Sequence, residues 1–179
     1  MYKSNGFTLI ETMIVVTVLA IIAAFSAPIF ATWMQDSRTR TVAESLQNGI
    51  RLAQSEAVNK GRQVAFYVTT ESPSANAAAE SAGSNWGVRV VVPTQADVNN
   101  GYIQGAVLKA DGGATVMVNT TNPEIRFNSI GRLVNTASQV TYNITNSKGA
   151  RKLNVRVSSA GSVRMCDPDK VISSSADGC

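Results

Sequence analysis

Apolar positions divide the chain into one long helical segment and a series of short alternating runs. Between Thr12 and Gln35 the sequence carries no charge, and beyond it apolar residues recur at three- and four-residue spacing. Because an α-helix repeats every 3.6 residues, we expect one helix that is apolar all round in its first half and on one stripe in its second. The stripe consists of Val42, Leu46, Ile50, Ala53 and Ala57, and the opposite, polar face of Arg38, Glu44, Gln47, Arg51 and Gln54.

The sequence also indicates where this helix ends and where it bends. Asn59-Lys60-Gly61 places a cation in the last turn and a glycine just beyond it, which is typical of a helix C-terminus. A helix from Phe7 to about Lys60 would be roughly 80 Å long at 1.5 Å per residue. Pro28 lies inside it, lacks a backbone N–H and crowds the carbonyl group four residues earlier, so we expect a kink or local loosening there.

After Gly61 the period changes from that of a helix to that of a strand. Short runs that alternate apolar and polar residues predict an antiparallel β domain with one covered face. We expect a hairpin loop from Asn146 to Gly149, whose glycine is able to take a positive φ, and a second turn at Ala160-Gly161. Residues 71–84 are expected to form a mobile loop and residues 95–101 another loop. The alternating runs begin at Val64, Trp86, Val116, Ile125, Val140, Leu153 and Val163.

The apolar face of this sheet needs a cover, and the second half of the helix is the amphipathic segment that can provide it. The expected fold class is therefore α+β, with a long N-terminal helix packed on an antiparallel β-sheet head.

Composition argues against enzymatic chemistry. The 179 residues include 16 basic and 12 acidic side chains and no histidine, which removes the commonest general base and metal ligand. The sequence has no glycine-rich phosphate loop and no cysteine–histidine cluster, so we expect no enzyme, no cofactor and no metal. Asp167, Asp169 and Asp177 offer few of the six to eight oxygen ligands that calcium needs, and we expect them to form a solvated acidic tail.

The first residues carry the most specific pattern. Gly6-Phe7-Thr8-Leu9-Ile10-Glu11 precedes the uncharged run, behind a leader whose only charge is Lys3. A carboxylate inside an apolar helix costs roughly 2.5–3.5 kcal/mol on insertion scales, so Glu11 indicates a partner or a function. A secretory signal peptide has a shorter apolar stretch, and a plain membrane anchor gives no reason for Glu11. The pattern resembles the class III signal of type IV pilins and type II secretion pseudopilins.

This resemblance implies a processing step and an assembly role. A prepilin peptidase would cut between Gly6 and Phe7, Phe7 would be N-methylated, and Glu11 would pair with the terminal amine of a neighbouring subunit. A proline at the place of Pro28 is familiar in the same family, in which the helix melts nearby in several filaments.

The resemblance also implies a division of the chain and a location. Residues 1–6 would be the cleaved leader, residues 7–60 a helix that is transmembrane to about residue 34, and residues 61–179 a β-rich periplasmic head. The protein would sit in the inner membrane as a single-pass protein before joining a pilus or pseudopilus. Its partners would be other major and minor pilins and the prepilin peptidase.

Three later segments resemble the GspH/FimT group within this family. They are Arg51–Ala57 at the helix end, the turn Phe127–Arg132 and the last strand Gly161–Cys166. The implied function is that of a minor type IV pilin, a structural subunit of the pilus or of its tip complex. The first alternative is a minor pseudopilin of type II secretion.

The two cysteines lie near the C-terminus. In an exported chain, Cys166 and Cys179 are expected to form a disulfide, because oxidising compartments preserve such bonds. Closing a loop of this size is worth roughly 3 kcal/mol in the chain-entropy model.

A basic stretch raises the second alternative, a pilus-borne DNA-binding subunit. Some FimT members bind DNA through a Gly-Arg-x-Arg motif, and here the run Gly161-Ser162-Val163-Arg164 keeps only the second arginine. No exposed aromatic side chains that could stack on nucleobases are evident between these basic residues. A solvated face or a docking surface for the next subunit is therefore favoured over DNA. The candidate phosphate contacts are Arg132, Lys148, Arg151, Lys152, Arg156 and Arg164.

Overall fold

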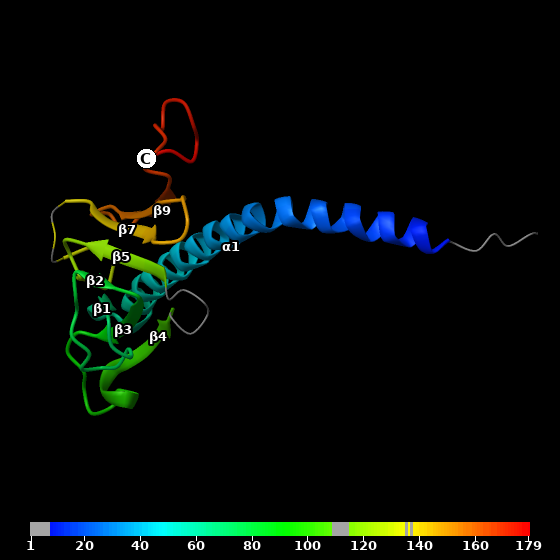
Figure 1. The fold of residues 1–179 in the computed structure, drawn as a ribbon. Coiled ribbons are helices and arrows are strands. Elements are labelled where there is room, and N and C mark those ends of the chain that lie inside the picture. The colour runs from blue at the N-terminus through cyan, green and yellow to red at the C-terminus, as the bar shows by residue number, and fades with distance from the viewer. Residues whose placement is uncertain (1–7, 109–114, 135, 137) are drawn as a thin grey trace, which may run out of the picture.

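The computed structural model describes residues 8–108, 115–134, 136 and 138–179. One long helix and a β head make up the molecule, and Figure 1 shows the first half of the helix extending well beyond the head. The second half of the helix lies against the strands, as the apolar stripe predicts.

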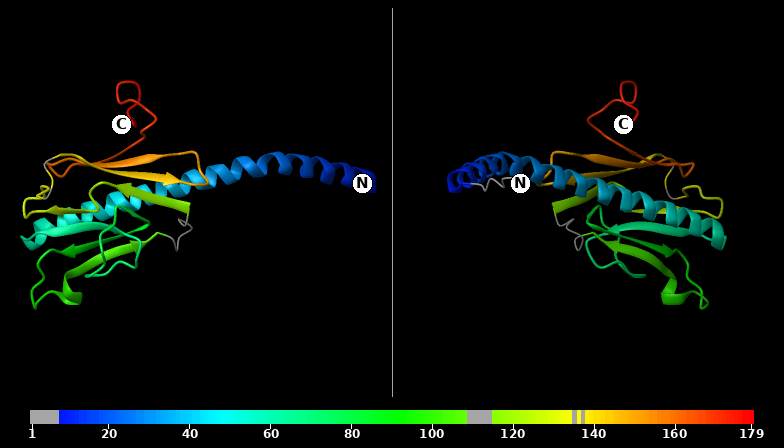
Figure 2. Two further views of the ribbon diagram at one scale, coloured as in Figure 1. Left: turned by 60° about the vertical axis from the view of Figure 1, so that its left-hand side comes forward. Right: turned by 90° about the vertical axis from the view of Figure 1, so that its right-hand side faces the viewer.

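The helix α1 spans Leu9–Lys60, so its 52 residues reach about 78 Å at the usual rise. It ends where the sequence predicts, because Gly61 takes a left-handed conformation at φ 64° and its N–H donates to the Val58 carbonyl group. The helix is continuous across residue 28, and Figure 2 shows its axis curving in the part that extends beyond the head. A kink caused by Pro28 itself stays a prediction.

The head contains two antiparallel sheets rather than the single sheet expected. The strand order of the first is β4-β3-β1-β6, and that of the second is β2-β5-β7-β8-β9. A short 3-10 helix, η1 (Val98–Gly101), precedes β4. The strands are β1 (Val64–Thr69), β2 (Ala82–Gly83), β3 (Asn85–Val90), β4 (Tyr102–Val107), β5 (Val116–Thr120), β6 (Glu124–Phe127), β7 (Val140–Asn146), β8 (Leu153–Val157) and β9 (Val163–Cys166).

Both sheets share one core with the helix. All five residues of the predicted apolar stripe are buried beneath the strands. Phe66 of β1 stacks on Trp86 of the same sheet and meets Tyr142 of the other sheet edge to face, with ring centroids 5.8 and 5.7 Å apart. One aromatic cluster thus joins the two sheets, and both pack with the second half of α1 around a single core.

Two residues of the predicted polar helix face contact the head instead of solvent. The side-chain amide of Gln54 donates to the Gly131 carbonyl oxygen at 2.8 Å, and that of Gln47 donates to the Val163 carbonyl oxygen at 3.4 Å. The polar face is therefore narrower than the sequence suggests. A polar amide side chain is assigned to the solvent-facing side of a helix by its polarity alone. It can nevertheless donate hydrogen bonds to backbone carbonyl groups of nearby turns.

Two loop predictions are also corrected. Gly149 has no positive φ; its small size matters instead, because a Cβ there would lie 3.3 Å from the Cβ of Gln35 on the helix. Residues 71–84, expected to be mobile, pack on the outer face of the first sheet, where Tyr67 donates to the Ser74 carbonyl group and Ala77 is buried. The same segment contains β2, which the sequence analysis missed.

Candidate assembly surfaces

Glu11 lies in the first turn of α1 with its side chain exposed. The hydroxyl group of Thr8 caps the helix by accepting a hydrogen bond from the Glu11 backbone N–H at 3.3 Å. Thr-x-x-Glu is the spacing of a capping box, a sequence signal that makes Thr8 the N-cap of a helix beginning at Leu9. The positive end of the helix dipole also favours a carboxylate here. Gly6 and Phe7 lie outside the described residues.

The first half of α1 exposes a mainly apolar surface, in which Glu11 is the one charged residue among those described. The exposed fraction of its large apolar residues runs from 37% at Met34 to 77% at Leu9. By length and composition this part of the helix can cross a membrane. A surface of this size does not remain in water in a stable soluble protein, so it requires lipid or other apolar helices around it.

A polar joint holds the head to the helix directly after this apolar half. The side-chain amide of Asn146, at the end of β7, donates to the main-chain oxygen of Gln35 at 3.0 Å and lies 3.3 Å from the Thr39 hydroxyl group. The backbone N–H of Arg151 donates to the Asp36 carboxylate at 3.0 Å. Asn146 and Thr39 are buried, so these bonds are shielded from water.

The three segments that carry the GspH/FimT resemblance meet at one point on the helix. Gln54 of the first segment bonds to Gly131 of the second, as described above. Gly161, which opens the third, has φ +90°, and a Cβ at this position would lie 2.2 Å from the Gly131 carbonyl oxygen. Three stretches far apart in sequence thus close one side of the core together.

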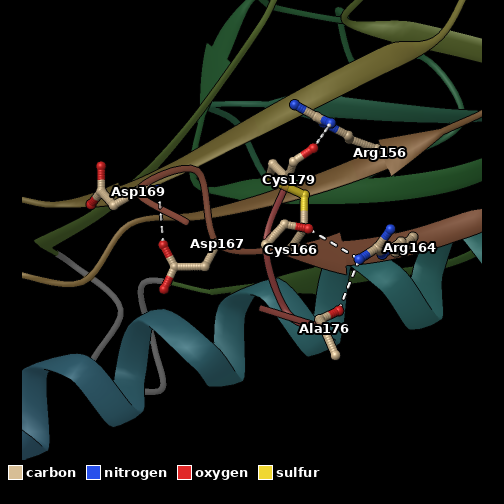
Figure 3. The surroundings of a disulfide bond; sticks show 8 residues. Arg156, Arg164, Cys166, Asp167, Asp169, Ala176 and Cys179 are labelled. Carbon is tan, nitrogen blue, oxygen red and sulfur yellow. Dashed lines mark hydrogen bonds between the residues drawn. A yellow bond between two sulfur atoms is a disulfide. The ribbon is translucent and has the colours of Figure 1, made fainter. Parts of the chain in front are cut away.

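The C-terminal loop is closed and braced. A disulfide joins Cys166 to Cys179, as predicted. Arg156 of β8 donates to the main-chain oxygen of Cys179 at 3.0 Å, and Arg164 of β9 donates to those of Ala176 and Gly178 at 2.9 and 3.0 Å (Figure 3). Arg156 and Arg164 face each other across the β8–β9 pair, so the two guanidinium groups act on one loop.

Two of the three acidic residues of this loop, Asp169 and Asp177, are exposed, as expected for a solvated acidic tail, whereas Asp167 departs from that expectation. Asp167 is buried and its carboxylate accepts the backbone N–H of Asp169 at 3.0 Å. Lys170 binds the Asp177 carboxylate at 2.6 Å and lowers the pKa of that carboxyl group to about 2. Within the described part of the chain, no three or more acidic, cysteine or histidine side chains are grouped so that they could hold a metal ion.

The six basic candidates do not form one patch. Arg132 follows the turn near Gln54, whereas Lys148, Arg151 and Lys152 flank the joint at Gln35 and Asp36. About 18 helical residues separate these two places, which is roughly 27 Å along α1. The guanidinium groups of Arg156 and Arg164 donate hydrogen bonds to main-chain oxygens of the C-terminal loop. DNA binding through this set stays a prediction, of weak affinity at physiological salt.

Comparisons with known proteins agree with this architecture. A family described as Type II transport protein GspH matches residues 42–161, and the prokaryotic N-terminal methylation motif matches residues 1–27. The fimbrial protein EcpB of Eikenella corrodens is 32% identical over 91 residues, which is 42% of this chain and 57% of EcpB. The matched stretch therefore spans little more than half the length of that relative.

Solved structures of low sequence identity share the fold. The minor type IV pilin FimU of Pseudomonas aeruginosa superposes with a TM-score of 0.57 at 17% identity, over 77% of this chain and 95% of FimU. The minor pseudopilin EpsH from the type II secretion system of Vibrio cholerae gives 0.50 at 14% identity, over 74% of this chain and 99% of EpsH. The long helix packed on antiparallel strands is thus the pilin and pseudopilin fold.

Proposed function

Because the chain belongs to the GspH family, a family of minor pilins and pseudopilins, we propose that it is a minor type IV pilin. It would be a structural subunit of a pilus or of its tip complex, with other pilins as its neighbours. Before assembly it would wait in the inner membrane, with residues 61–179 as the periplasmic head.

The contrast between the two halves of α1 is the observation that carries this proposal. The second half buries its apolar stripe in the head, whereas the first half leaves every large apolar side chain exposed. A helix that is apolar all round suits a membrane first and a bundle of like helices later, since both surround it with hydrocarbon. The N-terminal methylation motif covers this same half, up to residue 27.

Glu11 and the residues before it would provide the assembly chemistry. The leader 1–6 would be removed between Gly6 and Phe7, and the new amine on Phe7 would carry a methyl group. The Glu11 carboxylate faces outward from the first turn of α1 without an ion pair inside the described chain. In a membrane or in a filament core, this charge is stable only beside a cation, which the terminal amine of a neighbouring subunit supplies.

A pilus is favoured over a secretion machine by the fimbrial relative from Eikenella corrodens. The alternative, a minor pseudopilin of type II secretion, draws on the description of the matching family. A deletion strain separates them: loss of surface pili with intact protein secretion supports the pilin. Intact pili with lost secretion would favour the pseudopilin.

The proposal is tested on Glu11. Glu11→Gln keeps the shape of the side chain and removes its charge, and Thr17→Ala, on the same apolar half, serves as the control. The Glu11→Gln variant would leave the terminal amine of the neighbouring subunit buried without a counter-charge, which costs several kcal/mol. We therefore expect at least about tenfold less Glu11→Gln protein in sheared filaments, with normal amounts in the membrane. Equal incorporation of both variants would refute a pairing role for Glu11.

A further inference from the structure

The loop between β7 and β8, residues 147–152, lies against α1 at the point where its apolar half ends (Figure 1). Asn146 binds Gln35, and the Arg151 backbone binds Asp36. Gly149 approaches so closely that an added Cβ would be 3.1 Å from the Asp36 carboxylate. These three close approaches therefore hold the loop beside residues 35 and 36 of α1.

Trp33 indicates that the edge of a membrane would lie close to the same residues of α1. Trp33 is 64% exposed and its ring contacts Phe30 with centroids 5.8 Å apart. Exposed tryptophan at the end of an apolar helix prefers the interface between hydrocarbon and water. From Leu9 to Trp33 the helix rises about 36 Å, enough for a hydrocarbon core of about 30 Å with some tilt. Asp36 then lies about 4.5 Å beyond Trp33, within a headgroup layer roughly 5–7 Å thick.

Four cations gather at this level: Arg38 on α1 and Lys148, Arg151 and Lys152 on the loop. Both lysines are exposed, and the Arg38 guanidinium reaches back to the Met34 sulfur at 3.7 Å. Within the described residues, no ion pair involves any of the four. The carboxylate of Asp36 lies at the same position along the helix, so the four cations and this one anion together carry a net charge of +3. We call these four residues the basic collar.

We propose that the basic collar binds the phosphate groups of anionic lipids in the membrane from which α1 emerges. This inference rests on the proposed function for one premise, that the first half of α1 spans a bilayer. Each cation near an anionic surface strengthens binding by a factor of about five, and the effect decays within a Debye length. Lipid is favoured over nucleic acid because the joint holds the collar beside the membrane-spanning segment. The collar would set the orientation of the head before assembly.

Lysine reactivity of the full chain in lipid nanodiscs tests this inference. Acetylation of Lys148 and Lys152 is followed by mass spectrometry in neutral phosphatidylcholine discs and in discs with added phosphatidylglycerol. Anionic lipid should slow both lysines about fivefold at low salt, and 1 M salt, with a Debye length near 3 Å, should abolish the difference. Lys60, about 36 Å further along α1, serves as the internal control and should react equally in both discs.

A matched pair of variants isolates the charge. Arg38→Gln with Arg151→Gln removes two collar cations but keeps both lysine probes, and should weaken the protection. Arg51→Gln with Arg132→Gln removes the same charge far from the collar and should leave the protection unchanged.

Three results would overturn the inference. The first is equal lysine rates in neutral and anionic discs that contain the inserted protein, which leaves the pilin proposal standing. The second is protection by duplex DNA at physiological salt in neutral discs without protection by anionic lipid, which would assign the collar to nucleic acid. The third is failure of the chain to enter discs through α1, which would overturn the proposed function as well.

Discussion

Replacing both Cys166 and Cys179 with serine tests whether the C-terminal loop is part of the cooperative fold. The disulfide closes a loop with a sequence separation of 13, and Arg156 and Arg164 bind main-chain oxygens inside it. If the loop unfolds together with the head, opening the disulfide enlarges the conformational freedom of the unfolded chain only. The stability of the whole head then falls.

The magnitude follows from the loop length. For about 14 residues the chain-entropy expression gives roughly 10 cal/mol/K, which is about 3 kcal/mol at 25 °C. For a domain of this size, that loss of unfolding free energy lowers the melting temperature by roughly 6–12 °C. The two arginine contacts remain available in the serine variant, so we expect no further loss from them.

The assay is thermal and denaturant unfolding of a soluble fragment that starts at Gln35, because this residue completes the joint with Asn146. Wild-type protein in reductant should match the double serine variant, and the variant should not respond to reductant. Ser173→Ala, in the exposed part of the same loop, is the control. Melting temperatures within 2 °C of each other for wild type and double variant would refute the coupling between loop and head.

Two further predictions concern the core and pH. Ile50→Ala removes a fully buried side chain of the apolar stripe and should cost about 2–5 kcal/mol in denaturant unfolding, whereas Val58→Ala, half exposed on the same helix, should cost far less. The pKa of Asp177 is about 2 in the folded chain because Lys170 binds it, below the ordinary value of 3.8. Its contribution to stability is therefore present above about pH 4 and is lost as the pH falls toward 2. Asp177→Asn should flatten the pH dependence of the melting temperature in this window, and an unchanged slope would contradict the assignment.

Local patterns were sufficient to predict the helix and most strands. The stripe from Val42 to Ala57, the stop at Gly61 and the alternation in β7 each depend on neighbours within a few positions, and all are confirmed. The strand β1 forms where expected, but all of its residues are buried, so the single covered face expected for it is wrong. β4 was missed because Gly105 interrupts it and its residues are only partly buried, so no alternation appears. The division into two sheets depends on which strands pair, and pairing is a long-range property that periodicity does not contain.

The candidate sites divide in the same way. The cysteine pairing followed from compartment and number, and Glu11 from the cost of a charge in an apolar helix. The hydrogen bonds that Arg156 and Arg164 donate to the C-terminal loop were not predictable, because they depend on the fold bringing this loop back over β8 and β9. The joint at Gln35 and Asp36 likewise joins residues more than 100 positions apart.

The central claim, that this chain is a processed filament subunit, is tested most directly at its N-terminus. Filaments sheared from the native host are purified, and the chain within them is digested and sequenced by mass spectrometry. We expect the chain to begin with N-methylated Phe7 and to lack residues 1–6. A chain in those filaments that still begins at Met1, or an N-methylated chain found only in the membrane and never in filaments, would contradict the claim.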